Sequence, residues 1–254
     1  MRVAVCVKRV PITGGRIVLT DDAQAINTQH LGFTISPHEE CGVEEAVRLV
    51  EANKGESIVF TIGPAEAVEQ LRDCMALGID RAIHVRTYGR DWDGESTARV
   101  LFDVIRANEE DEGQFDIIFF GNESADSGGF QVGMRVAHAL GRPCVTGLKK
   151  VTVEGSSVRC EQDVDGARDV YVVQLPAVLT VKEGLNLPRY PSVPGRMRAR
   201  SKPVVTLNVE RPEQRLELVK LAVPAGQGRR AESLGAGAGA ASAIVDMLQQ
   251  AGVV

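Results

Sequence analysis

Residues 115–133 read FDIIFFGNESADSGGFQVG, and this stretch contains the strongest indication of the fold. The apolar run at 115–120 predicts a buried strand, and Val132, Val136 and Leu140 share one face of a following helix. A polar loop that contains glycine joins the two. Ligands bind at the carboxyl ends of parallel strands, where a helix N-terminus offers free N–H groups to an anion. The stretch therefore predicts a binding loop at one edge of a parallel sheet, although a plain glycine turn would read similarly.

The same order of strand and helix recurs through the first 145 residues. Short β-branched runs predict further strands at 2–7, 57–62 and 82–85. Apolar residues spaced three or four apart predict helices near 43–50, 68–75 and 101–105. Each strand has a helix to cover it, so the alternation predicts an α/β fold: a doubly wound, mostly parallel sheet with helices on both faces.

Beyond residue 145 the apolar pattern changes to a period of two. The alternating segments are 147–153, 157–163 and 169–175, with turn-forming pairs at 154–155 and 165–166. This pattern is typical of antiparallel hairpins appended to the parallel unit.

Two later segments show neither pattern. Residues 185–200 are rich in proline and basic side chains, so we expect no regular structure there. Residues 226–241 are rich in Gly, Ala and Ser and predict a flexible tether. After the tether, Ile244, Met247 and Leu248 share one helical face, which indicates a helix that docks on a partner.

Composition excludes several classes of function. The chain of 254 residues has 29 Lys and Arg against 34 Asp and Glu, a net charge of −5, so no basic footprint for nucleic acid is present. Its five cysteines lie far apart without C-x-x-C spacing, which argues against a zinc site or a disulfide framework. The sequence shows no leader and no apolar run of about 18 residues, so we expect a cytoplasmic protein without a transmembrane segment.

Motifs for catalysis are missing too. The chain has no G-x-S-x-G, no H-E-x-x-H and no Walker lysine, which favours a carrier or binding protein over an enzyme and predicts no metal site. Glu44 and Glu45 are neighbours on a helix, and we expect both to be solvated. His38, at the start of the helix near 43–50, either contacts a ligand ring or lies on the surface beside a helix cap.

Several segments, taken in order, resemble the beta subunit of electron-transfer flavoproteins. They are VCVKRV at 5–10, Pro37 with VEEAVRL at 43–49, GIDRA at 78–82, the 121–133 loop, PAVLTV at 176–181, LNLPRY at 185–190, and 197–202. The resemblance covers nearly the whole chain. It implies a doubly wound domain that pairs with an alpha subunit, which holds most of the redox-active FAD.

The resemblance also implies a second adenine nucleotide in this chain, which is AMP in ordinary members and a second FAD in electron-bifurcating ones. The residues that would contact the cofactors are Cys6, Thr13, Ser36, Pro37, His38, Glu39, Ile62, Asp126, Ser127, Gly128, Gly129, Phe130, Gln131, Val132 and Gly133. Among them, Thr13 and His38 would lie nearest the isoalloxazine ring.

A recognition loop at 183–202 is implied as well, between a nucleotide-binding domain at 1–182 and a C-terminal arm at 203–254 that docks on the alpha subunit. Its docking residues would be Tyr190, Val193, Arg196, Met197, Arg198 and Arg200, with Val193 where a leucine is usual. The implied donors are acyl-CoA or related flavin dehydrogenases of fatty acid oxidation, and the implied acceptor is a quinone oxidoreductase of the respiratory chain.

Other hypotheses remain open at this point. An electron-bifurcating relative is one. A freestanding regulator that binds an adenine nucleotide is another, but such a protein would not need the residues beyond about 150. An ATP-dependent enzyme would need a catalytic lysine or metal-binding carboxylates near the first strand, where Lys8 and Arg9 form the one nearby basic pair.

Overall fold

A nine-stranded sheet forms the centre of the protein, in the strand order β11-β5-β4-β1-β6-β10-β7-β8-β9. The computed structural model describes residues 1–12, 17–223 and 233–253. The parallel strands are β1 (Arg2–Cys6), β4 (Glu56–Gly63), β5 (Arg81–Arg86), β6 (Ile117–Gly121), β7 (Cys144–Glu154), β10 (Ala177–Val181) and β11 (Val204–Asn208). The predicted α/β class with a mostly parallel sheet is confirmed.

Strand β1 lies in the middle of the parallel part. Its residues Val3–Cys6 pair with Ser57–Phe60 of β4 on one side and with Ile117–Phe120 of β6 on the other. Both faces of these strands are covered, which explains why their sequences are continuous apolar runs rather than alternating ones.

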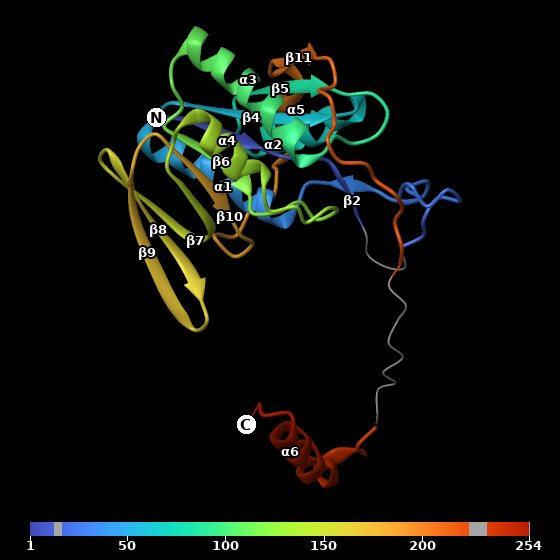
Figure 1. Cartoon of the computed structure of the whole chain (residues 1–254). Coiled ribbons are helices and arrows are strands. Elements are labelled where there is room, and N and C mark those ends of the chain that lie inside the picture. Colours follow the sequence, from blue (N-terminus) through green and yellow to red (C-terminus); the bar gives the residue numbers. More distant parts are fainter. Residues whose placement is uncertain (13–16, 224–232, 254) are drawn as a thin grey trace.

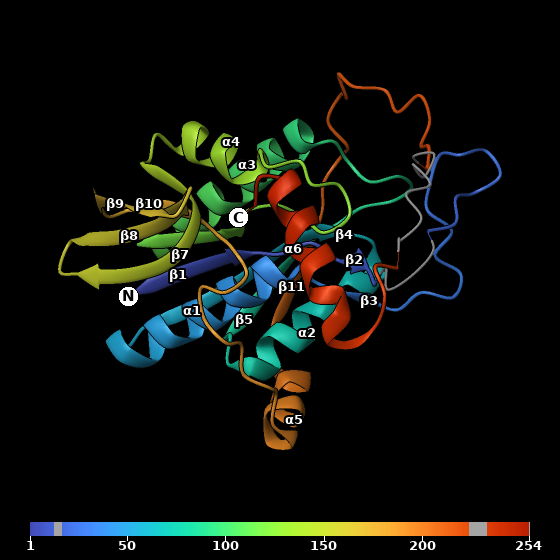
Figure 2. The ribbon, with the colours of Figure 1, turned by 90° about the horizontal axis from the view of Figure 1, so that it is seen from below.

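Helices cover both faces of the sheet, and the sheet separates two apolar cores. On one face lie α1 (Pro37–Asn53) and α2 (Val68–Leu77), and on the other lie α3 (Gly94–Glu112) and α4 (Val132–Leu140). A 3₁₀ turn, η1 (Ala65–Ala67), precedes α2, and Gly78 follows it as the C-cap, as expected from the sequence. Figures 1 and 2 show this arrangement from two directions.

The predicted hairpins are confirmed. Strand β7 turns back into β8 (Ser157–Val164), which turns back into β9 (Ala167–Gln174), and the three pair antiparallel. They extend the parallel sheet at the β10 side and end it at β9, as Figure 1 shows. A small separate ribbon pairs β2 (Val10–Pro11) with β3 (Phe33–Thr34).

The prediction of irregular structure at 185–200 is wrong for its second half. Residues Val193–Ser201 form helix α5, because Pro194 suits a first helical turn and the Ser192 hydroxyl accepts the Gly195 N–H at 3.1 Å. Strand β11 was not predicted, although residues 204–207 (VVTL) form a short β-branched run; it adds to the sheet beside β5.

The chain ends in a short 3₁₀ turn, η2 (Gly237–Ala240), and helix α6 (Ala241–Gln250), so the expected C-terminal helix is confirmed. The middle of the predicted tether, 224–232, lies outside the described residues. No residue of α6 is buried, and in Figure 1 the helix stands apart from the sheet. Its apolar face is thus left uncovered in the free chain.

Candidate functional site

The carboxyl ends of β1 and β6 lie side by side at one edge of the sheet, and the space between the loops that follow them is called the crevice below. The chain leaves β1 toward α1 on one face and leaves β6 toward α4 on the opposite face. Neighbouring parallel strands whose connections diverge in this way form the topological switch point at which open α/β sheets bind ligands. The sheet order therefore places a candidate binding site here.

The structure brings most of the predicted nucleotide residues to this edge. Cys6 ends β1, Ile62 lies next to the last residue of β4, and 126–133 follow β6. Residues 36–39 begin α1, where the Ser36 hydroxyl donates to the Glu123 carbonyl at 3.3 Å and so joins the start of α1 to the loop after β6. Thr13 lies outside the described residues.

Cys6 differs from the others because its side chain faces the core. It is 5% exposed and packs among the apolar residues under α3 and α4. Burial first, and the nearby Glu39 second, raise the pKa of this thiol well above its usual value, so it stays protonated. Only its backbone is placed to line the crevice.

Glu39 is a buried carboxyl at the base of the crevice. Its two oxygens accept the N–H groups of Lys8 and Ser36, each at 3.0 Å. Its stem packs on Gly121 so closely that a Cβ added there would lie 2.7 Å from Glu39 Cγ. Burial raises the pKa of Glu39 to about 8, although both amide hydrogen bonds and Lys8 act to lower it.

His38 is held between two loops. Its Nδ1 accepts the Glu183 N–H at 2.7 Å, and its Nε2 lies 3.5 Å from Glu123 Oε1. Because Nδ1 is an acceptor, the neutral ring carries its proton on Nε2. The ring is therefore fixed in orientation rather than free on the surface.

The loop after β6 carries free backbone donors. The Gly128 N–H is used within the loop by the Ser124 carbonyl, but those of Gly129, Phe130 and Gln131 have no hydrogen-bond partner in the part of the chain that the structure describes. A Cβ added at Gly129 would meet no atom closer than 3.7 Å, so the backbone there is open to a ligand. These donors stand at the start of α4, where the helix dipole favours an anion.

Two residues of the predicted set have a packing role. Gly133 is buried, and a Cβ there would lie 2.8 Å from Thr180 Cγ2 and 3.1 Å from the Phe120 ring. Val132 packs against the core under α4. The absence of a side chain at 133 therefore lets α4 approach the sheet, a role the loop motif alone did not reveal.

Sequence reasoning missed the ion pairs of this site. The Lys8 ammonium contacts Asp126 Oδ2 and lies 3.0 Å from Asp91 Oδ2. Burial acts to lower the pKa of Lys8, but the two carboxylates outweigh burial and hold it above its ordinary value. The position of Lys8 directly after the first strand was a signal, but nothing in the sequence identified Asp91 or Asp126 as its partners.

A second candidate surface lies on α5, far from the crevice in sequence. Tyr190 is 96% exposed, Val193 73% and Met197 67%, although all three have large apolar side chains. Val193 and Met197 lie one helical turn apart, on the same side of α5. Arg196, Arg198 and Arg200 are exposed on the same helix, so the surface combines apolar and basic side chains.

Helix α5 is fixed on α2 by its opposite side. Gly195 and Ala199 are buried against α2, and a Cβ added at Gly195 would lie 2.5 Å from the Ala76 carbonyl oxygen. Arg72 Nη1 donates to the Ala199 and Lys202 carbonyls at 2.5 and 2.6 Å. These contacts attach α5 by backbone atoms, which holds the whole helix in place.

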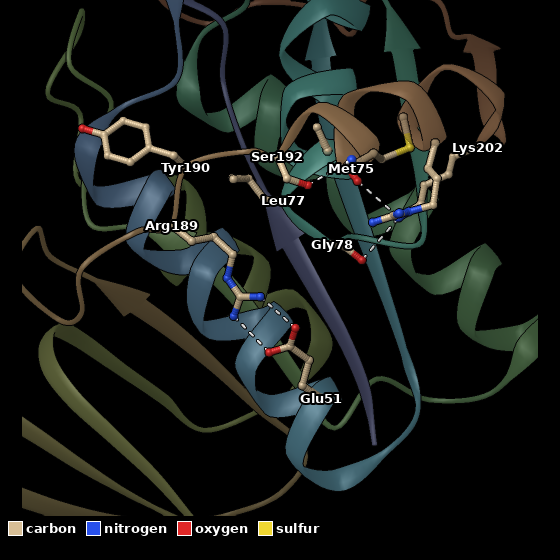
Figure 3. Close-up of a pocket in the computed structure, with 11 residues that line it drawn as sticks. Glu51, Met75, Leu77, Gly78, Arg189, Tyr190, Ser192 and Lys202 are labelled. Atoms are coloured by element: carbon tan, nitrogen blue, oxygen red, sulfur yellow. Dashed lines mark hydrogen bonds and ion pairs between the residues drawn. The ribbon is translucent and has the colours of Figure 1, made fainter.

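Lys202 completes this attachment, as Figure 3 shows. Its ammonium donates to the carbonyls of Met75, Gly78 and Ile79 at 3.2, 3.4 and 2.5 Å, and so satisfies acceptors at the C-terminal end of α2. A pocket of about 290 Å³ lies between the two helices, lined in part by Tyr190 and Arg198.

The expectation that Glu44 is solvated is wrong. Its side chain is 2% exposed and accepts from Arg48 Nε at 2.6 Å and Arg189 Nε at 3.0 Å. Arg189 also forms a bidentate ion pair with Glu51, in which Nη1 donates to Oε1 at 2.7 Å and Nη2 donates to Oε2 at 2.9 Å, as drawn in Figure 3. The carboxylates of α1 thus hold the segment that leads into α5.

In the described ranges, no group of three or more His, Cys, Asp or Glu side chains could hold a metal ion. No helix in the same ranges is long and apolar enough to cross a membrane.

Comparison with known proteins agrees with this geometry. A family model described as the electron transfer flavoprotein domain matches residues 24–212. The electron transfer flavoprotein subunit beta of Bacillus subtilis is 34% identical over 212 residues, covering 83% of this chain and 80% of that protein. Proteins of the same name from Bradyrhizobium diazoefficiens and Mus musculus are 34% and 33% identical, over 232 and 205 residues. These two matches cover 89% and 80% of this chain, and 91% and 80% of the respective proteins.

Proposed function

This chain belongs to the electron transfer flavoprotein family, among its beta subunits, and from that premise we propose that it is one half of a heterodimeric electron carrier. Its partner is an electron transfer flavoprotein alpha subunit, which holds most of the FAD. The chain itself performs no substrate chemistry. It binds a nucleotide in the crevice, presents α5 to donor proteins, and docks on the alpha subunit through 203–254.

The nucleotide in the crevice is AMP, or a second FAD. The observation that carries this assignment is the row of free amides at Gly129, Phe130 and Gln131, placed at a helix N-terminus beside the switch point. Phosphate and pyrophosphate oxygens accept such N–H groups without needing a cationic side chain. The residues present therefore fit the phosphate of such a nucleotide.

When bound, the flavin supplies one-electron and two-electron transfer. The contribution of this chain is to position groups around the ring. His38, fixed by the Glu183 amide, presents its Nε2 in one orientation, and Thr13 is the second side chain that we place near the ring.

Helix α5 is the docking surface for donors. Its apolar centre, Val193 and Met197, fits a concave apolar patch, and its arginines favour a partner with an acidic rim. We place acyl-CoA dehydrogenases or related flavin dehydrogenases here as donors, and a quinone oxidoreductase as the acceptor. The route would carry electrons from fatty acid oxidation toward the respiratory chain.

The test is to co-purify the chain with its alpha subunit, denature the complex, and quantify released AMP and FAD by chromatography. One FAD and one AMP per heterodimer is the expected result. Two FAD would indicate an electron-bifurcating member instead. No flavin and no stable partner would refute the heterodimeric carrier and favour a freestanding nucleotide-binding protein.

A further inference from the structure

Lys8 spans the crevice at the switch point. It lies two residues after the end of β1, and its ammonium contacts Asp126, which lies in the loop after β6. The same ammonium lies 3.0 Å from Asp91, in the segment between β5 and α3. One side chain thus connects three segments that are distant in the chain, with Asp126 lying 118 residues after Lys8, at the place where a ligand would enter.

The charged groups of Lys8 and Asp126 both have partners within the protein. The Asp126 side chain is 15% exposed; its Oδ2 contacts Lys8, and its Oδ1 accepts the Ser127 N–H at 2.8 Å. The Lys8 side chain is 32% exposed, whereas Asp91 is 68% exposed and adds a weaker, solvated contact. The ammonium is therefore already neutralised before any anion arrives.

The backbone of Lys8 is fixed as firmly as its side chain. Its N–H donates to Glu39 Oε1 at 3.0 Å, and Glu39 Oε2 accepts the Ser36 N–H at 3.0 Å. Glu39 in turn packs on Gly121, the last residue of β6. The Lys8 end of the connection is thus tied through Glu39 to the end of β6.

A lysine beside a phosphate site is ordinarily read as a phosphate ligand, but the charges here argue otherwise. A phosphate that reached the Lys8 ammonium would also approach Asp126 and Asp91 and be repelled by them. The amides at 129–131 are not hydrogen-bonded to any carboxylate among the described residues. The Lys8–Asp126 ion pair and the uncharged amide donors at 129–131 are thus two separate parts of the site.

We propose that Lys8 and Asp126 are positioning residues: their contact holds the loop after β6 against β1, so that the amides at 129–131, rather than the Lys8 ammonium, bind the anionic part of the nucleotide. This inference rests on the proposed function, because it presumes that the crevice takes an adenine nucleotide. It also removes Asp126 from the residues that contact the nucleotide directly.

The variants Lys8→Met and Asp126→Asn test the proposal by the direction of their effects. Each is made in the heterodimer, bound nucleotide is removed, flavin content is verified, and AMP affinity is measured by calorimetry. A positioning contact predicts that both variants weaken AMP binding, by roughly tenfold, and that the double variant is no weaker than either single one. A phosphate-binding Lys8 predicts that Asp126→Asn strengthens AMP binding, which would overturn the proposal.

Hydrogen exchange supplies the second readout. In the nucleotide-free complex, amides of 124–131 should exchange faster in both variants, while those of β1 and β6 keep their wild-type rates. Lys8→Arg should keep AMP affinity within about threefold, because the guanidinium still reaches Asp126. The matched control is Lys54→Met, an exposed lysine at the other end of α1, which should change nothing. Unchanged exchange in both variants would refute the connection.

Failure of the proposed function gives a different result. A wild-type heterodimer that binds neither AMP nor FAD in the crevice would refute the nucleotide site, and with it this proposal, whatever the variants do. Weakened AMP binding in Lys8→Met alone, with Asp126→Asn unchanged, would leave the nucleotide site standing and overturn only the positioning contact.

Discussion

Glu39 shows how one buried group makes stability depend on pH. Its folded-state pKa of about 8 lies above the usual value of 4.5, so the folded protein holds a proton that the unfolded chain has released between these values. The stabilisation is complete below about pH 4.5 and is lost as pH rises through 8, with a slope of at most about 1.4 kcal/mol per pH unit.

Glu39→Gln should flatten this slope. The amide cannot titrate, so its free energy of unfolding, measured by urea titration from pH 5 to 8, should fall less with pH than that of the wild type. Its overall stability should be lower by about 1–3 kcal/mol, because one of the two amide donors loses its acceptor. The exposed Glu66→Gln is the control. Equal slopes in Glu39→Gln and wild type would contradict the prediction.

Val193 is the residue whose substitution tests the proposed docking of donor proteins most directly. It is 73% exposed, so Val193→Ala should leave folding and flavin content unchanged while removing two methyl groups from a donor contact. We expect the KM for the carrier in dehydrogenase-driven flavin reduction to rise roughly tenfold, with little change in kcat. A parallel loss of flavin would show that the residue supports the fold rather than docking.

The packing of α5 against α2 requires a residue without a side chain at position 195. A Cβ at Gly195 would lie 2.5 Å from the Ala76 carbonyl, closer than atoms pack, so Gly195→Ala must move α5 off α2. Overpacking of this kind costs about 1–3 kcal/mol. Trypsin should then cleave after Arg196, Arg198 and Arg200 faster than in the wild type.

The control for this change is Gly239→Ala, where an added Cβ would meet no atom within 4 Å and the backbone is not left-handed. It should show wild-type cleavage in α5. If Gly195→Ala is also cleaved at the wild-type rate, the attachment through Arg72 and Lys202 is enough to hold the helix, and the tight contact at 195 is not needed.

Helix α6 should contribute to binding the alpha subunit but not to the stability of the free chain. None of its residues is buried, and Ile244, Val245 and Met247 are between 42% and 49% exposed. A chain that ends at residue 223 should therefore unfold within about 0.5 kcal/mol of the full chain. It should bind the alpha subunit at least about tenfold more weakly, measured by calorimetry on the separated subunits. Equal affinity would exclude α6 from the interface.

The alternation of strands and helices was determined by the sequence alone, because it depends on the spacing of apolar residues within a few turns. The same local signals predicted the hairpins and the loop after β6. Helix α5 was not predicted, because its apolar residues face outward. Its buried positions are Gly195 and Ala199, whose small side chains add little to an apolar periodicity.

Tertiary structure alone decided which polar groups meet. Lys8 and Asp126 are 118 residues apart, and Glu44 and Arg189 are 145 apart. Both contacts exist because the sheet places β6 beside β1 and because the chain after β10 returns over α1. Local periodicity carries no information on strand order, so the burial of Glu44, the raised pKa of Glu39 and the connection across the crevice could only emerge once the strands were assembled.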